Sequence, residues 1–383
     1  MALPRRSLRP ALIRLASVSA SVVVALLAAE AVVRVFPKVL PARLRDAAMS
    51  RYDALPGGIY QYEGMTGMRF MRPCATVRAY SAGYTWIHQT DERGYRNPPG
   101  LADHRVLLLG DSLVYGHGVE GDQTVAHALR TEYGVAAYDM SAQGECLYEH
   151  YVTLRLFADE LDPDTVLLFV FVNDIRDILK LRRHELEPGP PEIDRFDYEL
   201  IRQRLDALRE FRYPRLTSVA YSSSLVRLFA KTRSWRPAPP AMSITPPEWR
   251  PPKRDDLGRT DRRRLPSSAP LAVLDRELFG PINVYYDTVL GDLAARCTGR
   301  GTRLVVVHLV PPSEIDWPQR ERAQEVLHRS LDAICSRHRI ELVDTRPLFQ
   351  DRTELILPGD GHLNPEGHRV LARFLAHKLL DQG

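Results

Sequence analysis

The 383-residue chain has little lysine, so its positive charge is carried almost wholly by arginine. Only five of its 52 basic residues are lysines, and its arginines are interspersed with acidic residues, as in Arg254-Asp255-Asp256. The formal net charge is only +4. A nucleic-acid-binding surface collects basic residues on one element, whereas mixed charges are typical of a solvated surface. The composition therefore predicts no nucleic-acid partner.

Cysteine is also scarce. The four cysteines stand at positions 74, 146, 297 and 335, without a C-x-x-C pair or a histidine at zinc-finger spacing, so the sequence predicts no metal site and no cofactor. In an oxidising compartment they could form disulfides. We favour a bond between Cys297 and Cys335, because both lie in predicted helices that flank one strand, although sequence alone does not fix the pairing. No serine has the G-x-S-x-G surroundings of an α/β-hydrolase.

One long apolar run is present, at residues 15–33, and as a helix it would be about 28 Å long, close to the thickness of a bilayer core. Four arginines precede it, so residue 1 is expected in the cytoplasm and the rest of the chain outside. Glu30 lies four residues before Arg34 and can pair with it. We predict that residues 1–36 are an uncleaved, single-pass anchor in the cytoplasmic (inner) membrane, with a periplasmic domain beyond. A signal peptide cleaved near Ala29 and Ala31 is the alternative.

Short apolar segments alternate with helical patterns from residue 101 onward. Strands are expected at 106–109, 135–138, 165–172, 303–309 and 341–343, and helices at 123–133, 147–160, 282–297, 320–337 and from Pro365, with Asn364 as its N-cap. The central strand is apolar almost throughout, as in a parallel sheet covered on both faces. This alternation predicts βαβ units.

The chain is thus predicted to have three parts. Residues 1–36 form the tail and anchor, and residues 37–100 form an irregular lead-in with a few short strands that pack on the main domain. Residues 101–383 form an α/β domain. Residues 181–276 interrupt this domain as an insertion, with short helices around a proline-rich stretch at 237–252.

Several residues that can carry chemistry follow the ends of successive predicted strands. The carboxyl ends of parallel strands meet at one edge, where open α/β sheets build their sites. Cleavage of an ester needs a hydroxyl, a base, a group that orients the base, and donors for the oxyanion. Ser112 supplies the hydroxyl, His362 the base and Asp360 the orienting carboxylate. The backbone N–H groups of Ser112 and Gly144, with the side-chain amide of Asn173, supply the oxyanion hole.

A simpler interpretation is that these polar residues cap the helices that follow the strands. Asp111 and Ser112 stand at a strand-to-helix turn, and Asn173 also precedes a helical pattern. We expect His368 to lie on a helix surface.

Four sequence blocks resemble the SGNH or GDSL-type hydrolase superfamily in order and spacing. They are Gly110-Asp111-Ser112, Gly144, Asn173-Asp174 and the D-G-H-L-N-P-E-G-H segment at 360–368. The anchor, the G-Y-R segment at 94–96 and the insertion resemble the membrane-anchored, exported bacterial members. The resemblance implies a flavodoxin-like three-layer α/β/α sandwich around a parallel sheet. It also implies hydrolysis or transfer of acyl groups, with the serine, glycine, asparagine and histidine in the roles given above.

Two positions depart from the pattern of this superfamily. Phe171 stands where the third block commonly has glycine, and Asp360 lies two residues before His362, where the usual spacing is three. A carboxylate at the shorter spacing can still reach the imidazole, or a backbone carbonyl can orient it. Asp344, which also follows a predicted strand, is a further candidate.

We therefore expect an exported, membrane-anchored serine esterase that hydrolyses acyl or acetyl esters on a carbohydrate or another envelope component. Two alternatives stay open. One is a polysaccharide O-acyltransferase that uses the same serine and a membrane acyl-donor protein as partner. The other is a non-catalytic envelope scaffold with the same fold.

Overall fold

A five-stranded parallel sheet forms the centre of the computed structural model, which describes residues 9–63, 66, 68–174, 197–232, 279–312 and 318–380. Its strands are β5 (Val106–Leu109), β6 (Ala137–Asp139), β7 (Thr165–Val170), β8 (Arg303–His308) and β9 (Glu341–Asp344). They lie in the order β6-β5-β7-β8-β9. The chain places β6 on one side of β5, and β7 and the later strands on the other side. Open α/β sheets bind their ligands at such a switch point, which here lies between β5 and β7.

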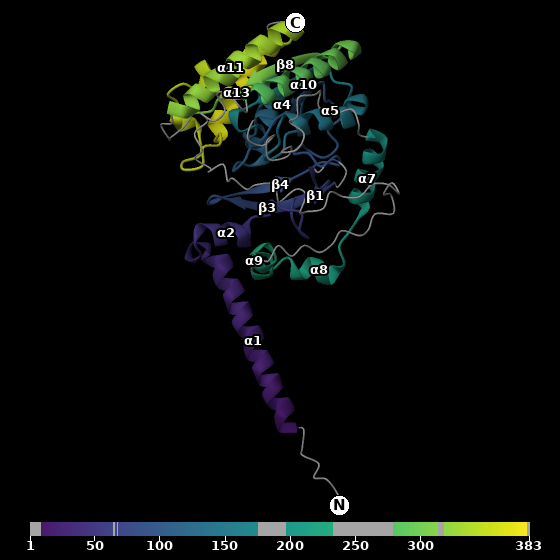
Figure 1. Cartoon of the computed structure of the whole chain (residues 1–383). Helices are drawn as coiled ribbons and strands as arrows, with labels where there is room; N and C mark the ends of the chain where they lie inside the picture. Colours follow the sequence, from purple (N-terminus) through teal and green to yellow (C-terminus); the bar gives the residue numbers. More distant parts are fainter. Residues whose placement is uncertain are drawn as a thin grey trace, which may run out of the picture.

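Helices cover both faces of this sheet (Figure 1). Leu108, Leu167 and Val305 point to one face, where they join the apolar core of α4 (Val125–Tyr133) and α13 (Pro365–Leu380). Their neighbours Leu107 and Val166 point to the other face, which is covered by α5 (Leu147–Leu161), α10 (Phe279–Arg300) and α11 (Pro318–His338). The predicted three-layer sandwich is confirmed, because alternate residues of each buried strand serve opposite cores.

The lead-in consists of α2 (Ala42–Met49) and two antiparallel strand pairs. β1 (Tyr60–Tyr62) pairs with β2 (Arg69–Met71), and β3 (Thr76–Ser81) pairs with β4 (Tyr84–Gln89). The segment after β4 is fastened to the main sheet. Both polar atoms of the Asn97 side chain bond the backbone of Asp139, each at 2.9 Å. The lead-in therefore packs directly on the α/β domain.

Three helices of the predicted insertion lie within the described residues: α7 (Tyr198–Glu210), α8 (Arg215–Ala220) and α9 (Ser224–Thr232). α7 packs against α5, and α9 packs against α1 (Arg9–Val35) and α2. The proline-rich stretch at 237–252 lies outside the described residues. α1 projects from the domain at the end opposite the C-terminus (Figure 1), and over Ile13–Val35 it is long and apolar enough to cross a membrane.

Most predicted elements are found within two or three residues of their predicted ends. The central strand stops at Val170, earlier than predicted, because the chain turns there and the Asp174 carboxylate accepts a hydrogen bond from the Phe171 N–H at 3.1 Å. Asn364 is confirmed as the N-cap of α13, since its Oδ1 accepts a hydrogen bond from the Gly367 N–H at 2.9 Å.

Two predictions about single side chains are wrong. The predicted disulfide is not formed, and Cys297 and Cys335 are free thiols buried in one apolar core. Burial raises their pKa to about 11 and about 12, so both remain protonated and pack as small apolar side chains. His368 is fully buried and does not lie on the helix surface. It shares the inward stripe of α13 with Leu371 and Leu375, at helical spacing.

Candidate active site

Ser112 stands at the carboxyl end of β5, in a turn that requires glycine at position 110. A Cβ on Gly110 would come within 2.5 Å of the Val114 side chain, so a larger residue would push the turn apart. Asp111 caps α3 (Ser112–Tyr115) by accepting a hydrogen bond from the Leu113 N–H at 2.9 Å. The capping interpretation thus holds for Asp111, and it leaves the Ser112 hydroxyl available for another partner.

That partner is His362, which lies 250 positions further along the chain. Its Nε2 is 2.8 Å from the Ser112 Oγ, and its Nδ1 is hydrogen-bonded to the Asp360 carboxylate. The structure therefore brings the predicted hydroxyl, imidazole and carboxylate into one continuous chain of contacts.

The short spacing between Asp360 and His362 is accommodated by a tight loop. Gly359 and Gly361 both have positive φ, at 71° and 85°, a backbone conformation that other residues rarely adopt. The N–H groups of Asp360 and Gly361 both bond the carbonyl of Leu357, at 3.1 and 3.2 Å. This turn doubles the chain back, so that a carboxylate only two residues before the imidazole reaches its Nδ1.

Asp360 is held in its charged form by its neighbours. Burial by itself would raise the pKa of this carboxyl group. The hydrogen bond from His362 and the charges of His362 and His117 lower the pKa further than burial raises it, so the pKa lies below its usual value. An ionised carboxylate at Nδ1 favours the tautomer in which Nε2 can accept a proton from a hydroxyl.

His117 is a part of this cluster that the sequence analysis missed. Its ring stacks on that of His362, with centroids 4.2 Å apart, and its Nε2 is 3.7 Å from Asp360 Oδ2. Its Nδ1 lies 2.6 Å from Gln143 Nε2, which donates a hydrogen bond to it. Burial, followed by the charge of His362, lowers the pKa of His117 to about 4, so this imidazole is neutral near pH 7.

The signal for His117 in the sequence is its position between two glycines, five residues after the serine. Gly116 and Gly118 both have a φ of 81°. The buried Arg96 holds this turn by donating hydrogen bonds to the carbonyls of Gly116 and Val119, each at 2.6 Å. Arg96 belongs to the G-Y-R segment noted in the sequence, which therefore has a structural role behind the site.

The predicted oxyanion donors lie at the same edge of the sheet. Asn173 Nδ2 donates a hydrogen bond to Asp111 Oδ2 at 2.9 Å. Gly144 has a φ of 70°, and its loop is tied to the serine turn by a bond of 3.1 Å from the Ala142 N–H to the Gly110 carbonyl. Among the described residues, the backbone N–H groups of Ser112 and Gly144 donate to no other protein atom.

The lead-in supplies further side chains around this cluster. Trp86 of β4 packs on the His117 ring, with centroids 4.8 Å apart, and Tyr52 stacks on it at 5.9 Å. The guanidinium group of Arg69, on β2, lies beside Gly144. Its Nη2 is 3.6 Å from the position that a Cβ atom would occupy on this glycine. Residues 37–100 thus contribute both apolar contacts and a cation to the rim of the site.

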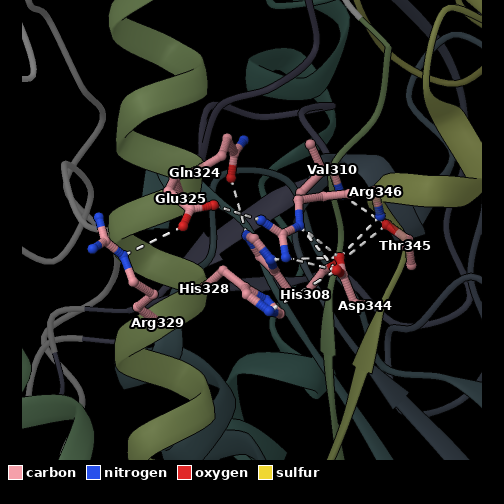
Figure 2. A network of polar contacts seen from close by, with 9 residues as sticks. All are labelled: His308, Val310, Gln324, Glu325, His328, Arg329, Asp344, Thr345 and Arg346. Atoms are coloured by element: carbon pink, nitrogen blue, oxygen red, sulfur yellow. Dashed lines mark hydrogen bonds and ion pairs between the residues drawn. The ribbon is translucent and has the colours of Figure 1, made fainter.

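A second group of histidine and carboxylate side chains lies at the ends of β8 and β9 (Figure 2). His308, His328 and Asp344 offer ligand atoms within 4.8 Å of one another, which is compatible with metal binding. However, Arg346 donates to both oxygens of Asp344, at 3.0 and 2.9 Å, and already supplies the positive charge there. His308 Nε2 is hydrogen-bonded to Gln324 Oε1 at 3.1 Å. The partners of Asp344 therefore lie in this network, away from His362.

Comparison with known proteins agrees with this fold. The model of the GDSL-like lipase/acylhydrolase family matches residues 108–370, which is more than half of the chain. No curated protein matches the sequence.

The solved structures that match this chain are only distantly similar to it. An esterase, EstA, from Pseudoalteromonas sp. is 11% identical, with 73% of this chain and 98% of that chain covered and a TM-score of 0.38. A GDSL-like lipase from Bacteroides thetaiotaomicron is 10% identical, with 75% and 93% covered and a TM-score of 0.36. The acetylxylan esterase Axe2 from Geobacillus stearothermophilus is 12% identical, with 72% and 94% covered and a TM-score of 0.36. The family assignment rests on the sequence model, and on that basis the chain belongs to the GDSL-like lipase/acylhydrolase family and is an ester-hydrolysing enzyme.

Proposed function

We propose that this enzyme is an exported, membrane-anchored serine esterase in which Ser112 is the nucleophile, His362 the general base and Asp360 the carboxylate that orients it. The observation that carries this proposal is the unbroken contact from the Ser112 hydroxyl through His362 to Asp360, with 2.8 Å between Oγ and Nε2. That distance allows direct proton transfer between the two groups.

The reaction begins when Ser112 Oγ attacks the acyl carbonyl while its proton passes to His362 Nε2. The C=O electron pair moves to oxygen and forms a tetrahedral oxyanion. Collapse of this intermediate expels the alcohol, which takes the proton from Nε2, and leaves the acyl group on Ser112. Water then repeats the two steps and releases the acid.

The developing oxyanion needs donors that are already in place, because these cost no reorganisation in the transition state. The N–H groups of Ser112 and Gly144 serve this role, since neither is used elsewhere among the described residues. Asn173 has two amide hydrogens. One is directed to Asp111, which leaves the other for the oxyanion and fixes the rotation of the amide.

The ester is proposed to be an acyl or acetyl ester of a carbohydrate or another envelope component. The support for this location is α1, whose apolar segment Ile13–Val35 follows an arginine-rich start of the chain. Such a segment holds the α/β domain on the outer side of the inner membrane, where envelope polymers are accessible. Transfer of the acyl group from a membrane donor protein to a sugar hydroxyl would use the same acyl-serine.

The test is labelling with a fluorophosphonate, which reacts with activated serines, followed by location of the adduct by mass spectrometry. We expect the adduct on Ser112, and its loss in Ser112→Ala and His362→Ala. Ser141→Ala is the matched control, because Ser141 is a buried serine of a neighbouring loop and should leave labelling intact. Equal labelling of all three variants would refute the assignment of the nucleophile.

Hydrolysis and transfer are separated by the products. The full chain in detergent, supplied with an acylated donor and an oligosaccharide, should release free acid if it is an esterase. Acylated oligosaccharide as the main product would establish the transferase alternative.

A further inference from the structure

The end of the apolar helix α1 is bonded to the folded domain. The Glu30 carboxylate accepts hydrogen bonds from the Ser223 hydroxyl at 2.8 Å, the Ser224 N–H at 2.8 Å and the Leu225 N–H at 3.0 Å. Arg34 donates to Glu30 at 2.6 Å and to the Ser222 carbonyl at 2.7 Å. The predicted pairing of Glu30 with Arg34 is thus confirmed, and it belongs to a larger contact that we call the anchor clamp, made of Glu30, Arg34 and residues 222–225.

The anchor clamp fixes α9 at the boundary of the apolar segment. Glu30 lies five residues before the end of the segment Ile13–Val35, which is about 7 Å along a helix. A carboxylate at that depth needs partners, and the N–H groups at the start of α9, which have no acceptor within the helix, provide them. The start of α9 must therefore lie where α1 leaves the apolar phase.

α9 is in turn fastened rigidly to the lead-in. The fully buried Arg227 donates to Asp53 at 2.5 Å and to the Pro56 carbonyl at 2.8 Å. Lys231 lies 2.9 Å from the same carboxylate. α9 is bonded to α1 on one side and to the lead-in on the other. Hydrogen bonds therefore hold α1 to the domain in addition to the covalent chain.

Apolar side chains are exposed at this same end of the molecule. On α8, Leu216 is 85% exposed and Val219 is 68% exposed, and they share one face because they are three residues apart. Phe229 of α9 is 56% exposed. Val35, Phe36 and Val39 are exposed around the exit of α1. We call these six residues the anchor-side face.

Single exposed apolar residues are normal, but a group of them on one end of a domain marks a contact surface. Figure 1 shows α8 and α9 at the end of the domain from which α1 departs. Exposed basic residues accompany the group, at Lys38, Arg43, Arg212 and Arg215. Apolar side chains with neighbouring cations match the boundary between acyl chains and anionic headgroups.

We propose that the anchor-side face lies in the headgroup layer of the bilayer that α1 spans, and that the anchor clamp holds the domain there in one orientation. This inference rests on the membrane anchoring stated in the proposed function. It has a consequence for the active site. Trp86 of β4 packs on His117, and Figure 1 shows β3 and β4 between α2 and the α/β domain. The catalytic edge of the sheet is therefore on the half of the domain that faces the membrane.

The test places a fluorophore on single cysteines of the full-length protein in nanodiscs of phosphatidylethanolamine and phosphatidylglycerol. The exposed Cys74 is first replaced by serine. An environment-sensitive probe is then attached at Leu216→Cys, Val219→Cys or Val284→Cys. Val284 is the matched control, because it is an exposed apolar residue of α10, with 56% of its surface accessible.

We expect lipids that carry a quencher near the headgroup to quench the probes at 216 and 219 several-fold more than the probe at 284, and aqueous iodide to show the reverse order. Equal quenching by iodide at all three positions would overturn the proposal.

The clamp is tested with Glu30→Ala, read with the probe at 219. We expect lipid quenching at 219 to fall at least twofold, while the protein stays in the nanodisc and its turnover of a soluble p-nitrophenyl ester is unchanged. Unchanged quenching would overturn the role of the clamp. If Glu30→Ala does not fold, Arg34→Gln is measured in the same way.

The mass of the chain isolated from cells shows whether the N-terminal segment is kept, and this result separates a failure of this inference from a failure of the proposed function. An intact chain with water-exposed probes overturns only the surface contact. A mature chain that begins near Ala31 lacks the clamp and overturns both the anchor and this inference.

Discussion

Replacement of Asp360 by asparagine tests the assignment of the orienting group most directly. In the proposed mechanism His362 takes the proton of Ser112 and becomes a cation beside the Asp360 carboxylate. Two unit charges about 4 Å apart at an effective dielectric constant of about 20 attract each other by about 4 kcal/mol. Loss of this attraction in the transition state corresponds to a decrease in kcat of about 10³-fold.

The asparagine amide also donates to Nδ1 and favours the tautomer whose Nε2 carries a hydrogen, which cannot act as a base. We therefore expect Asp360→Asn to lower kcat by about 10³- to 10⁴-fold, with little change in KM. The assay is turnover of p-nitrophenyl acetate by the full chain, with circular dichroism to confirm folding.

The matched control is Asp344→Asn. Asp344 was the alternative carboxylate in the sequence, but it is bonded to Arg346 and faces His308 and His328. We expect kcat to stay within about twofold of the native value, because this substitution touches no group of the site. A decrease of less than about tenfold in Asp360→Asn would refute the reasoning, as would a larger effect of Asp344→Asn.

Three further outcomes follow from the structure. Arg96→Ala should lower the free energy of unfolding by about 3 kcal/mol, measured by urea denaturation, because it leaves the buried carbonyl of Val119 without a donor and that of Gly116 with only a long bond of 3.4 Å from the Val119 N–H. Gly144→Ala should cost about 1 kcal/mol by the same measurement, because φ is 70° there, whereas the added Cβ makes only an ordinary contact at 3.6 Å with Arg69. Burial raises the pKa of Glu145 to about 8, so this group stabilises the fold fully below its ordinary pKa of 4.5 and loses that contribution as the pH rises to about 8. Glu145→Gln should therefore gain stability relative to the native chain between pH 5 and pH 8, and a constant difference across that range would contradict the burial argument.

Much of the fold could be predicted from the sequence because its signals are local. The apolar run that became β7 and the proline after Asn364 each specify their element without reference to distant residues. The predicted nucleophile and base could be named for the same reason, since each follows a strand or opens a helix. Alternating strands and helices then left few ways to order the sheet.

The two wrong predictions concern side chains whose environment depends on how helices pack against the sheet. His368 is expected on a helix surface, yet helical spacing places it on the inward stripe with Leu371. Cys297 and Cys335 were paired by their place beside a strand. Both thiols are buried in the apolar core of the same cluster, where they remain free.

By itself, the sequence determined the parallel α/β class and an N-terminal apolar segment long enough to span a membrane, and it singled out Ser112, Asp360 and His362 as candidates, because these features follow from the order of residues along the chain. Only the tertiary structure decided that the short loop lets Asp360 reach His362, that His117 stacks on that imidazole, and that Glu30 bonds the start of α9. The physical reason is the separation of these partners. Glu30 and Ser224 are 194 positions apart, and such contacts exist only after the sheet and its covering helices have packed.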